Sequence, residues 1–150
     1  MTLPLILVDT NVLVYFYDPN SPKKQNEAGM VLERLHETGQ GRLSVQTLAE
    51  LINAALRKLD PPLTPSQAME QASFLAAAWQ ILDLTPQIVL EAARGVRDHN
   101  LAYYDAQIWA AARLNQIPVI FSEDFQDGQI LEGVRFVNPF KRGFDVAEWL

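Results

Sequence analysis

A short, unbroken run of apolar residues that ends in an aspartate constrains the fold of this chain most. Leu5-Ile6-Leu7-Val8 is apolar throughout, partly β-branched, and followed directly by Asp9. Because a half-buried strand alternates apolar and polar residues, this run predicts a strand buried on both faces, as in a parallel sheet covered by helices. An aspartate that ends such a strand costs free energy unless hydrogen-bond donors or a metal ion compensate its charge.

Proline and capping residues divide the rest of the chain into alternating helices and short strands. Ser21-Pro22, Thr64-Pro65 and Thr85-Pro86 each combine a candidate N-cap with proline at the first helical position. We expect helices over about residues 22–38, 46–59, 65–79, 86–98 and 103–115, and strands over about 5–8, 42–45, 81–84, 118–121 and 134–137. This order predicts an α/β fold with a mostly parallel sheet of about five short strands. Since no repeat or linker interrupts it, residues 1–150 are expected to form a single domain.

Composition excludes several classes of protein. With 150 residues, of which 49% are hydrophobic and 20% charged, the chain has the balance of one globular domain. The absence of cysteine excludes zinc ribbons, disulfide scaffolds and thiol nucleophiles. The apolar run is far shorter than the ~20 residues of a membrane span, and no signal peptide is present, so we expect a cytoplasmic protein with no membrane partner. A net charge of −6 argues against nucleic-acid binding by bulk electrostatics, so such a substrate needs a local cation or a basic partner.

Acidic residues occupy the positions where α/β sheets place their ligands. Asp9 follows the first expected strand, and Glu123-Asp124 follows the fourth. Glu50 and Asp105 lie near the starts of two expected helices. Because ligand sites form at the carboxyl ends of parallel strands, these acids are candidates for one site. Each acid could instead be a helix cap or a solvated surface residue with no role in a site. For Glu50, a position on a solvated helix face is the favoured interpretation.

The chain offers no other catalytic apparatus. It contains no phosphate-binding glycine loop, no Gly-x-Ser-x-Gly elbow and no dinucleotide fingerprint. Asn11 stands where an Asp-x-Asp phosphatase has its second acid. Carboxylates alone suit Mg²⁺ or Mn²⁺, which activate water and stabilise charge on a phosphodiester. A cation would also remove a repulsion of up to roughly 4 kcal/mol for each close pair of acids.

Four segments resemble PIN-domain ribonucleases in order and spacing. They are Asp9-Thr10-Asn11-Val12-Leu13-Val14-Tyr15, Ser44-Val45-Gln46-Thr47-Leu48-Ala49-Glu50-Leu51, Tyr104-Asp105-Ala106-Gln107-Ile108, and Ser122-Glu123-Asp124-Phe125-Gln126-Asp127-Gly128. The similarity covers about residues 5–139 and leaves residues 140–150 as a tail, in which Trp149 suggests that the end docks on the domain.

This resemblance implies a three-layer α/β/α sandwich and a Mg²⁺- or Mn²⁺-dependent endoribonuclease. Asp9, Glu50 and Asp105 match the three main acids of the family, and Asp124 matches its more variable fourth acid. Supporting roles are implied for a hydroxyl, a polar residue beside the first acid and a further acid that binds metal directly or through water: Ser122, Asn11 and Asp127. Glu123, adjacent to Asp124, is expected to face solvent.

Single-domain PIN proteins of this length are most often toxins of VapBC-type toxin–antitoxin modules, so the resemblance also implies an antitoxin partner and a homodimer. Candidate RNA-binding cations, chosen from charge alone, are Arg57, Lys58, Arg94 and Arg97. The tyrosines near the acids are candidates either for base stacking or for the core: Tyr15, Tyr103 and Tyr104. Two rival functions remain open. One is a non-catalytic PIN-like RNA-binding or protein-interaction module, and the other is a metal phosphohydrolase that acts on small phosphate esters.

Overall fold

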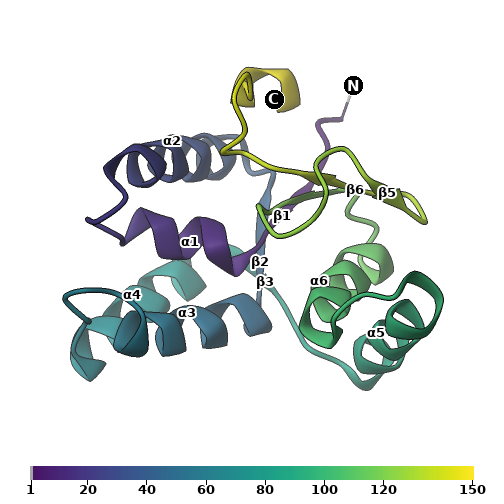
Figure 1. The fold of residues 1–150 in the computed structure, drawn as a ribbon, viewed down its shortest axis with the longest axis horizontal. Coiled ribbons are helices and arrows are strands. Elements are labelled where there is room, and N and C mark those ends of the chain that lie inside the picture. The colour runs from purple at the N-terminus through teal and green to yellow at the C-terminus, as the bar shows by residue number, and fades with distance from the viewer. Residues whose placement is uncertain (1) are drawn as a thin grey trace.

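A six-stranded sheet forms the middle layer of the molecule. The computed structural model describes residues 2–150, and Figure 1 shows its sheet between two groups of helices. The strand order is β3-β2-β1-β4-β6-β5. In chain order the strands are β1 Ile6–Val8, β2 Gly41–Ser44, β3 Gln80–Leu82, β4 Val119–Phe121, β5 Ile130–Leu131 and β6 Val134–Val137. The predicted α/β fold with a mostly parallel sheet is therefore confirmed.

The strand count differs from the prediction by one edge strand. All neighbouring strands are parallel except β5, which pairs antiparallel with β6. Glu132 and Gly133 join these two strands and both have positive φ, at 48° and 84°. A two-residue loop of this kind makes a tight hairpin. Because β5 is only two residues long, its sequence carries no strand periodicity, and the expectation of about five strands missed it.

Helices cover both faces of the sheet. They are α1 Thr10–Phe16, α2 Pro22–Thr38, α3 Val45–Arg57, α4 Pro65–Ala78, α5 Pro86–His99 and α6 Tyr103–Leu114. Ile6 and Val8 pack into a core shared with α1, α2, α3 and α4, whereas Leu7 packs into a second core shared with α5 and α6. All three side chains are fully buried, as the unbroken apolar run predicted.

Helix α1 was not predicted, and its cap explains why it forms. Asp9 has an extended backbone, and its Oδ1 accepts a hydrogen bond of 2.7 Å from the Thr10 N–H. An aspartate at this position satisfies a free amide of the first turn and is stabilised by the helix dipole. The predicted caps Thr64 and Thr85 accept hydrogen bonds from Gln67 N–H and Ile88 N–H, as expected.

The C-terminal segment packs on the core that the sheet shares with α2, and its last residues reach the start of β1. It forms a short 3-10 helix over Val146–Trp149, and the Trp149 ring packs edge-on against Phe121 with 6.0 Å between ring centroids. Gln40 Nε2 donates to the carbonyls of Pro4 and Trp149, at 2.9 Å and 2.7 Å. Trp149 therefore docks on the domain, as its sequence suggested, and the segment lies beside the start of β1.

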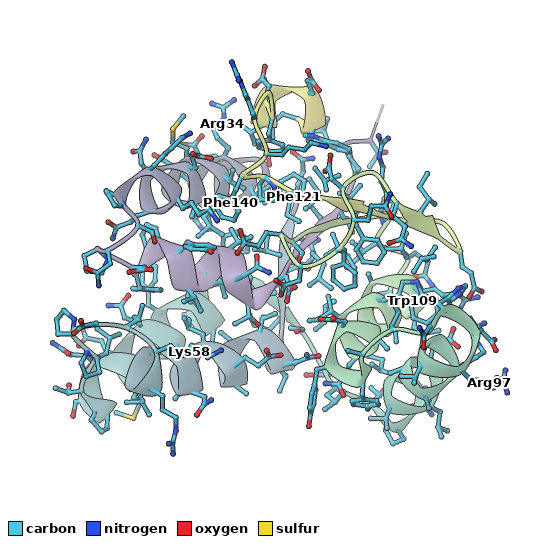
Figure 2. All side chains as sticks on the ribbon, in the orientation of Figure 1. Arg34, Lys58, Arg97, Trp109, Phe121 and Phe140 are labelled. Carbon is cyan, nitrogen blue, oxygen red and sulfur yellow. The ribbon has the colours of Figure 1, made fainter. Side chains whose placement is uncertain are left out.

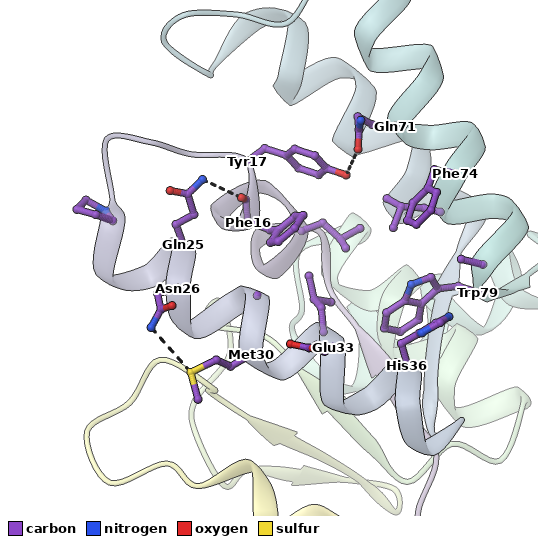
Figure 3. Close-up of a pocket in the computed structure, with 16 residues that line it drawn as sticks. Phe16, Tyr17, Gln25, Asn26, Met30, Glu33, His36, Gln71, Phe74 and Trp79 are labelled. Atoms are coloured by element: carbon purple, nitrogen blue, oxygen red, sulfur yellow. Dashed lines mark hydrogen bonds between the residues drawn. The ribbon is translucent and has the colours of Figure 1, made fainter.

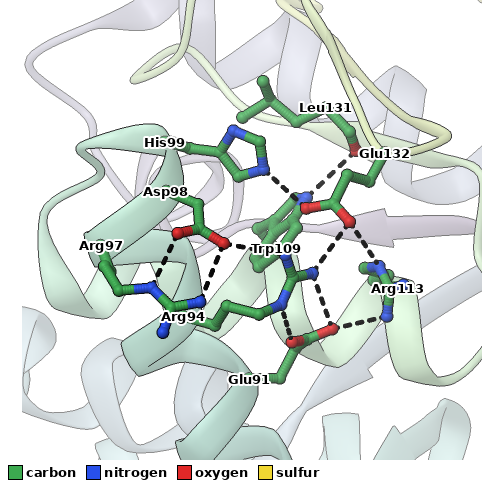
Figure 4. Close-up of polar contacts among 9 residues, drawn as sticks. All are labelled: Glu91, Arg94, Arg97, Asp98, His99, Trp109, Arg113, Leu131 and Glu132. Atoms are coloured by element: carbon green, nitrogen blue, oxygen red, sulfur yellow. Dashed lines mark hydrogen bonds and ion pairs between the residues drawn. The ribbon is translucent and has the colours of Figure 1, made fainter.

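An ion-pair network fastens the β5–β6 turn to α5 and α6 (Figure 4). Arg94 donates to Glu91 at 2.6 Å and to Glu132 at 2.9 Å, and Arg113 also pairs with Glu91. His99 Nε2 lies 2.6 Å from the other Glu132 oxygen. His99 therefore binds this turn, while Asn100 takes the left-handed C-cap position of α5. Within residues 2–150, none of the helices has the length and apolar character that crossing a membrane requires.

Candidate active site

Asp9 and Asp124 are linked through two polar side chains at the carboxyl edge of the sheet. Ser122 Oγ donates to Asp9 Oδ2 at 2.7 Å and accepts the Asp124 N–H at 3.1 Å. Asn11 Nδ2 donates to Ser122 Oγ at 3.0 Å and to Asp124 Oδ2 at 3.1 Å. The hydroxyl and the amide predicted to support the acids thus contact both of them.

Strand register brings these residues together from distant parts of the sequence. β1 and β4 are parallel neighbours in which Val8 pairs with Phe121, and the Asp9 N–H donates to the Phe121 carbonyl at 3.0 Å. The residues that follow the two strands therefore meet at one edge, as the position of parallel strand ends predicted.

Glu50 is oriented by a hydrogen-bonded pair of buried glutamines. Gln46 Nε2 donates to Glu50 Oε1 at 2.6 Å and to the Tyr104 carbonyl at 3.1 Å. Gln107 Nε2 donates to Gln46 Oε1 at 2.8 Å, so α3 and α6 are joined across the sheet edge. Sequence analysis assigned no role to either glutamine. The available signal was a polar residue on an apolar helix face, as in Ala106-Gln107-Ile108.

The electrostatics show that the four predicted acids share one region. The pKa of Asp9 is raised to about 6, chiefly by burial and also by the negative charges of Asp124 and Glu50, although the Ser122 and Thr10 hydrogen bonds oppose the shift. Burial likewise raises the pKa of Asp105, again with contributions from Asp124 and Glu50. Across residues 2–150, none of these four acids forms an ion pair with lysine, arginine or histidine. Their charges therefore repel without compensation from the protein.

Glu123 was expected to face solvent, but in the structure other side chains bind it. Its carboxylate accepts hydrogen bonds from the Tyr15 hydroxyl at 2.6 Å and from Lys24 Nζ at 2.9 Å, and its own N–H donates to Asn11 Oδ1 at 3.3 Å. Lys24 also lies over the Tyr15 ring. These contacts fasten the loop that carries Asp124 to α1 and α2. They were not visible in the sequence because Lys24 and Glu123 are far apart along the chain.

Asp127 lies outside this group of acids. Its Oδ1 accepts the Asn138 N–H at 2.8 Å and its Oδ2 pairs with Lys141 at 3.2 Å, and these partners lower its pKa. Asp127 lines a small hollow beside the C-terminal segment together with Lys141. Asp127 thus anchors that segment, a role that could not be predicted because its partners, Asn138 and Lys141, come after β6.

Of the four candidate RNA-binding cations, Lys58 alone lines the cleft beside the acids. Lys58 lies on the α3 side of the molecule, whereas Arg97 lies on the opposite side, on α5 (Figure 2). Arg94 is engaged by Glu91 and Glu132, and Arg97 pairs with Asp98. Arg57 Nε donates to Asn53 at 3.1 Å. Lys58 lines the same cleft as Asn11, Glu50 and Asp124.

The molecule has two large hollows of different chemistry. The cleft beside the acids has a volume of about 710 Å³. A second groove of about 870 Å³ lies between α1, α2 and α4, where Phe16, Phe74 and Trp79 line it (Figure 3). Glu33 is the one carboxylate among the residues that line this groove. The acidic chemistry therefore belongs to the smaller cleft.

The donors of the smaller cleft suit a hard divalent cation. Carboxylate, amide and hydroxyl oxygens are the ligands that Mg²⁺ and Mn²⁺ prefer. Thr10 Oγ1, next to Asp9, is buried and has no hydrogen-bond partner within residues 2–150, and the raised pKa of Asp9 marks an excess of negative charge. In the described residues, however, no group of three or more acidic or histidine side chains is arranged to hold a metal ion. The donor set fits such an ion, and binding one requires the acids to draw together.

Comparison with protein families and known structures gives a consistent assignment. The sequence profile described as the PIN domain matches residues 6–126. A search of curated proteins finds no significant match.

Several solved structures share the fold. A toxin–antitoxin complex from Klebsiella pneumoniae has a TM-score of 0.68 at 20% identity, covering 91% of this chain and 98% of that chain. A sarcin-ricin-loop-cleaving toxin from Mycobacterium tuberculosis has a TM-score of 0.63 at 18% identity, covering 85% and 97%. A DNA-bound VapBC complex from Salmonella typhimurium has a TM-score of 0.63 at 21% identity, covering 89% and 97%.

Proposed function

The chain belongs to the PIN domain family, and on that premise we propose that it is a Mg²⁺- or Mn²⁺-dependent endoribonuclease, the toxin of a toxin–antitoxin pair. One observation carries the proposal. The negative charges of Glu50 and Asp124 raise the pKa of both Asp9 and Asp105, and within residues 2–150 no basic side chain forms an ion pair with any of the four. Acids whose pKa is raised by neighbouring acids, with no basic partner, are typical of a functional site.

Asp9, Glu50 and Asp105 would hold one ion, and Asp124 would help to hold a second or orient a water molecule. A bound Mg²⁺ or Mn²⁺ supplies activation of water and stabilisation of the charge that develops on a phosphodiester. Ser122 and Asn11 fix the carboxylates of Asp9 and Asp124 by hydrogen bonds.

Gln46 fixes Glu50 in the same way through its amide. Glu50 and Asp124 line the cleft, where an RNA backbone would enter. Hydrolysis breaks the bond between phosphorus and one ester oxygen, and water provides the hydroxyl and the proton that complete the two products.

The test is cleavage of a mixed pool of structured and unstructured RNA by the purified protein. We expect cutting with Mg²⁺ or Mn²⁺, none with EDTA, and none with Asp9→Asn. Glu70→Gln is the matched control, because Glu70 is an exposed acid on α4. Retained RNA binding without cleavage by the wild-type protein would favour the non-catalytic module instead. Activity confined to a chromogenic phosphate monoester would favour a small-molecule phosphohydrolase.

The partners follow from the same proposal. Two of the structures with this fold are toxin–antitoxin or VapBC complexes, so we propose a small antitoxin partner for this chain, a homodimer, and action in the cytoplasm. Co-purification of the chain with the product of a neighbouring small reading frame tests the partner. Light scattering of the purified protein tests the dimer.

A further inference from the structure

Three exposed apolar side chains form a platform at one end of the acidic cleft. Val45, Leu84 and Tyr104 are 41%, 47% and 66% exposed, and all three line the cleft together with Glu50 and Asp124. Exposed apolar side chains that gather beside a polar site are typical of a ligand-binding surface, whereas single ones elsewhere on the surface need no such explanation.

The fold holds this platform in place. Ser44 of β2 pairs with Leu82 of β3, so Val45 and Leu84 follow neighbouring strand ends. The Tyr104 carbonyl accepts the hydrogen bond from Gln46, and the Tyr103 ring packs edge-on against the Tyr104 ring with 5.2 Å between centroids. Within residues 2–150 the Tyr104 hydroxyl makes no hydrogen bond, so the ring is braced by packing and presented to solvent.

A single cation lies toward the other end of the same cleft. Lys58 is the C-cap of α3 and the one lysine or arginine among the residues that line the cleft. It makes no ion pair within the part of the chain that the structure describes. It follows Glu50 by two helical turns, which corresponds to about 12 Å along the helix axis. Along α3 the order is therefore platform, acid and cation.

We propose that this cleft binds a single-stranded RNA segment with one unpaired base stacked on Tyr104, the scissile phosphate beside the acids, and a neighbouring phosphate on Lys58. This inference rests on the proposed function and names the residues that select its substrate. A base in a duplex has both faces covered, whereas an unpaired base offers a face to an aromatic ring. Lys58 offsets the repulsion between phosphates and acids in a chain whose net charge is −6.

Cleavage kinetics on an unstructured oligonucleotide test the platform. Tyr104→Ala should lower kcat/KM by roughly 10-fold to 100-fold, mainly through KM, because base stacking on an aromatic ring is lost. Tyr104→Phe keeps the ring and should stay within about two-fold of the wild type. Phe74→Ala is the matched control, since Phe74 is 65% exposed but lines the other groove.

An abasic substrate separates stacking from a structural role of Tyr104. Removing the base next to the cleaved bond should lower the cleavage rate of the wild type as much as Tyr104→Ala does. The same removal should not lower the rate of the Tyr104→Ala variant any further.

Lys58→Gln should raise KM for every sequence and reduce the salt dependence of binding by about one phosphate contact. Lys23→Gln, an exposed lysine away from the cleft, is its control.

The outcomes separate this inference from the proposed function. If the wild type cleaves RNA and neither Tyr104→Ala nor the abasic site changes the rate, the platform is wrong and the nuclease stands. If no RNA is cleaved, binding of the fluorescently labelled oligonucleotide to the same variants decides. If Tyr104→Ala and Lys58→Gln weaken binding, the platform is supported even though the nuclease is not. If neither substitution changes binding, or if the oligonucleotide does not bind, the platform is overturned as well.

Discussion

Two groups of acidic side chains in this molecule have opposite surroundings. Around the β5–β6 turn, Glu91 and Glu132 are bound by Arg94 and Arg113, and these partners lower the pKa of both, that of Glu132 to about 2. At the carboxyl edge of the sheet, burial raises the pKa of Asp9 to about 6. The fold therefore neutralises acids where they only join elements, and leaves them uncompensated where we propose chemistry. The uncompensated charge, more than the presence of acids, distinguishes the candidate site.

The largest expected difference between the two groups is in catalysis. Asp105→Asn should reduce RNA cleavage by roughly 1,000-fold, about 4 kcal/mol of transition-state stabilisation, because a metal ligand is lost. Glu91→Gln should leave kcat/KM within about two-fold at a temperature where the variant is folded. Initial rates under saturating Mg²⁺ measure both. Equal losses in the two variants would show that the acids of the cleft have no special role.

The next effect is on the free energy of unfolding. At neutral or higher pH, removing an acid should stabilise the protein at the cleft and destabilise it in the ion-pair network. For Asp9 the pKa is raised from 3.8 to about 6 on folding. Its favourable contribution is therefore fully present below the unfolded pKa and is lost as pH rises through the folded pKa. The Asp9→Asn substitution changes the free energy of unfolding at each pH. Without metal, we expect this change to be about 3 kcal/mol more stabilising at pH 8 than near pH 4. Urea unfolding of both proteins at the two pH values measures this.

A cation should reverse the cost that Asp9 imposes. Saturating Mg²⁺ at pH 8 is expected to raise the melting temperature of the wild type and to have little effect on Asp9→Asn. A wild-type melt at pH 8 that does not respond to Mg²⁺ or Mn²⁺ would count against a metal site made of these acids.

In the ion-pair network, removing an acid should destabilise the protein. Glu132→Gln leaves Arg94 and His99 without a negative partner, and a loss of about 1 kcal/mol in the free energy of unfolding is expected for this partly exposed group. Since the pKa of Glu132 is lowered on folding, its contribution is present above its unfolded pKa of 4.5 and is lost as pH falls toward about 2. Urea midpoints at pH 7 and pH 3 test this, and high salt should reduce the difference.

The smallest effect concerns Lys24, which pairs with Glu123, the residue next to Asp124 on the loop after β4. Lys24→Met leaves the negative charge of Glu123 without its partner near Asp124, so cleavage should fall by about two-fold to five-fold and require more Mg²⁺. The double variant Lys24→Met with Glu123→Gln should recover part of the loss, because that unpaired charge is gone. A double variant as impaired as the sum of the single ones would show that the pair does not position the loop.

Local sequence signals were sufficient for the frame of the fold. Proline with a capping threonine placed two helix starts correctly, and the unbroken apolar run identified β1. Asp9 stood out because an acid that ends a buried strand costs free energy unless hydrogen-bond donors or a metal ion compensate its charge. The same reasoning missed that Asp9 itself caps α1, since a cap and a ligand use the same residue type.

The parts that could not be predicted depend on tertiary contacts. Gln46 and Gln107 meet only because α3 and α6 converge, and Lys24 meets Glu123 only because α2 passes the β4 loop. Charge alone named four RNA-binding candidates, yet Arg94 and Arg97 are occupied by acids of their own region. Lys58 differs only in its position on α3, which no local pattern encodes.

The tie that Gln40 makes between Pro4 and Trp149 has a practical consequence for every experiment above. It holds Pro4 and Trp149 together beside the start of β2, and Figure 1 shows the two termini on the same side of the molecule. Asp9 and Asp124, in contrast, follow the carboxyl ends of β1 and β4. A purification tag, fluorophore or surface tether attached at either end would therefore leave the mouth of the cleft clear. Immobilised protein should bind the labelled oligonucleotide as well as protein free in solution.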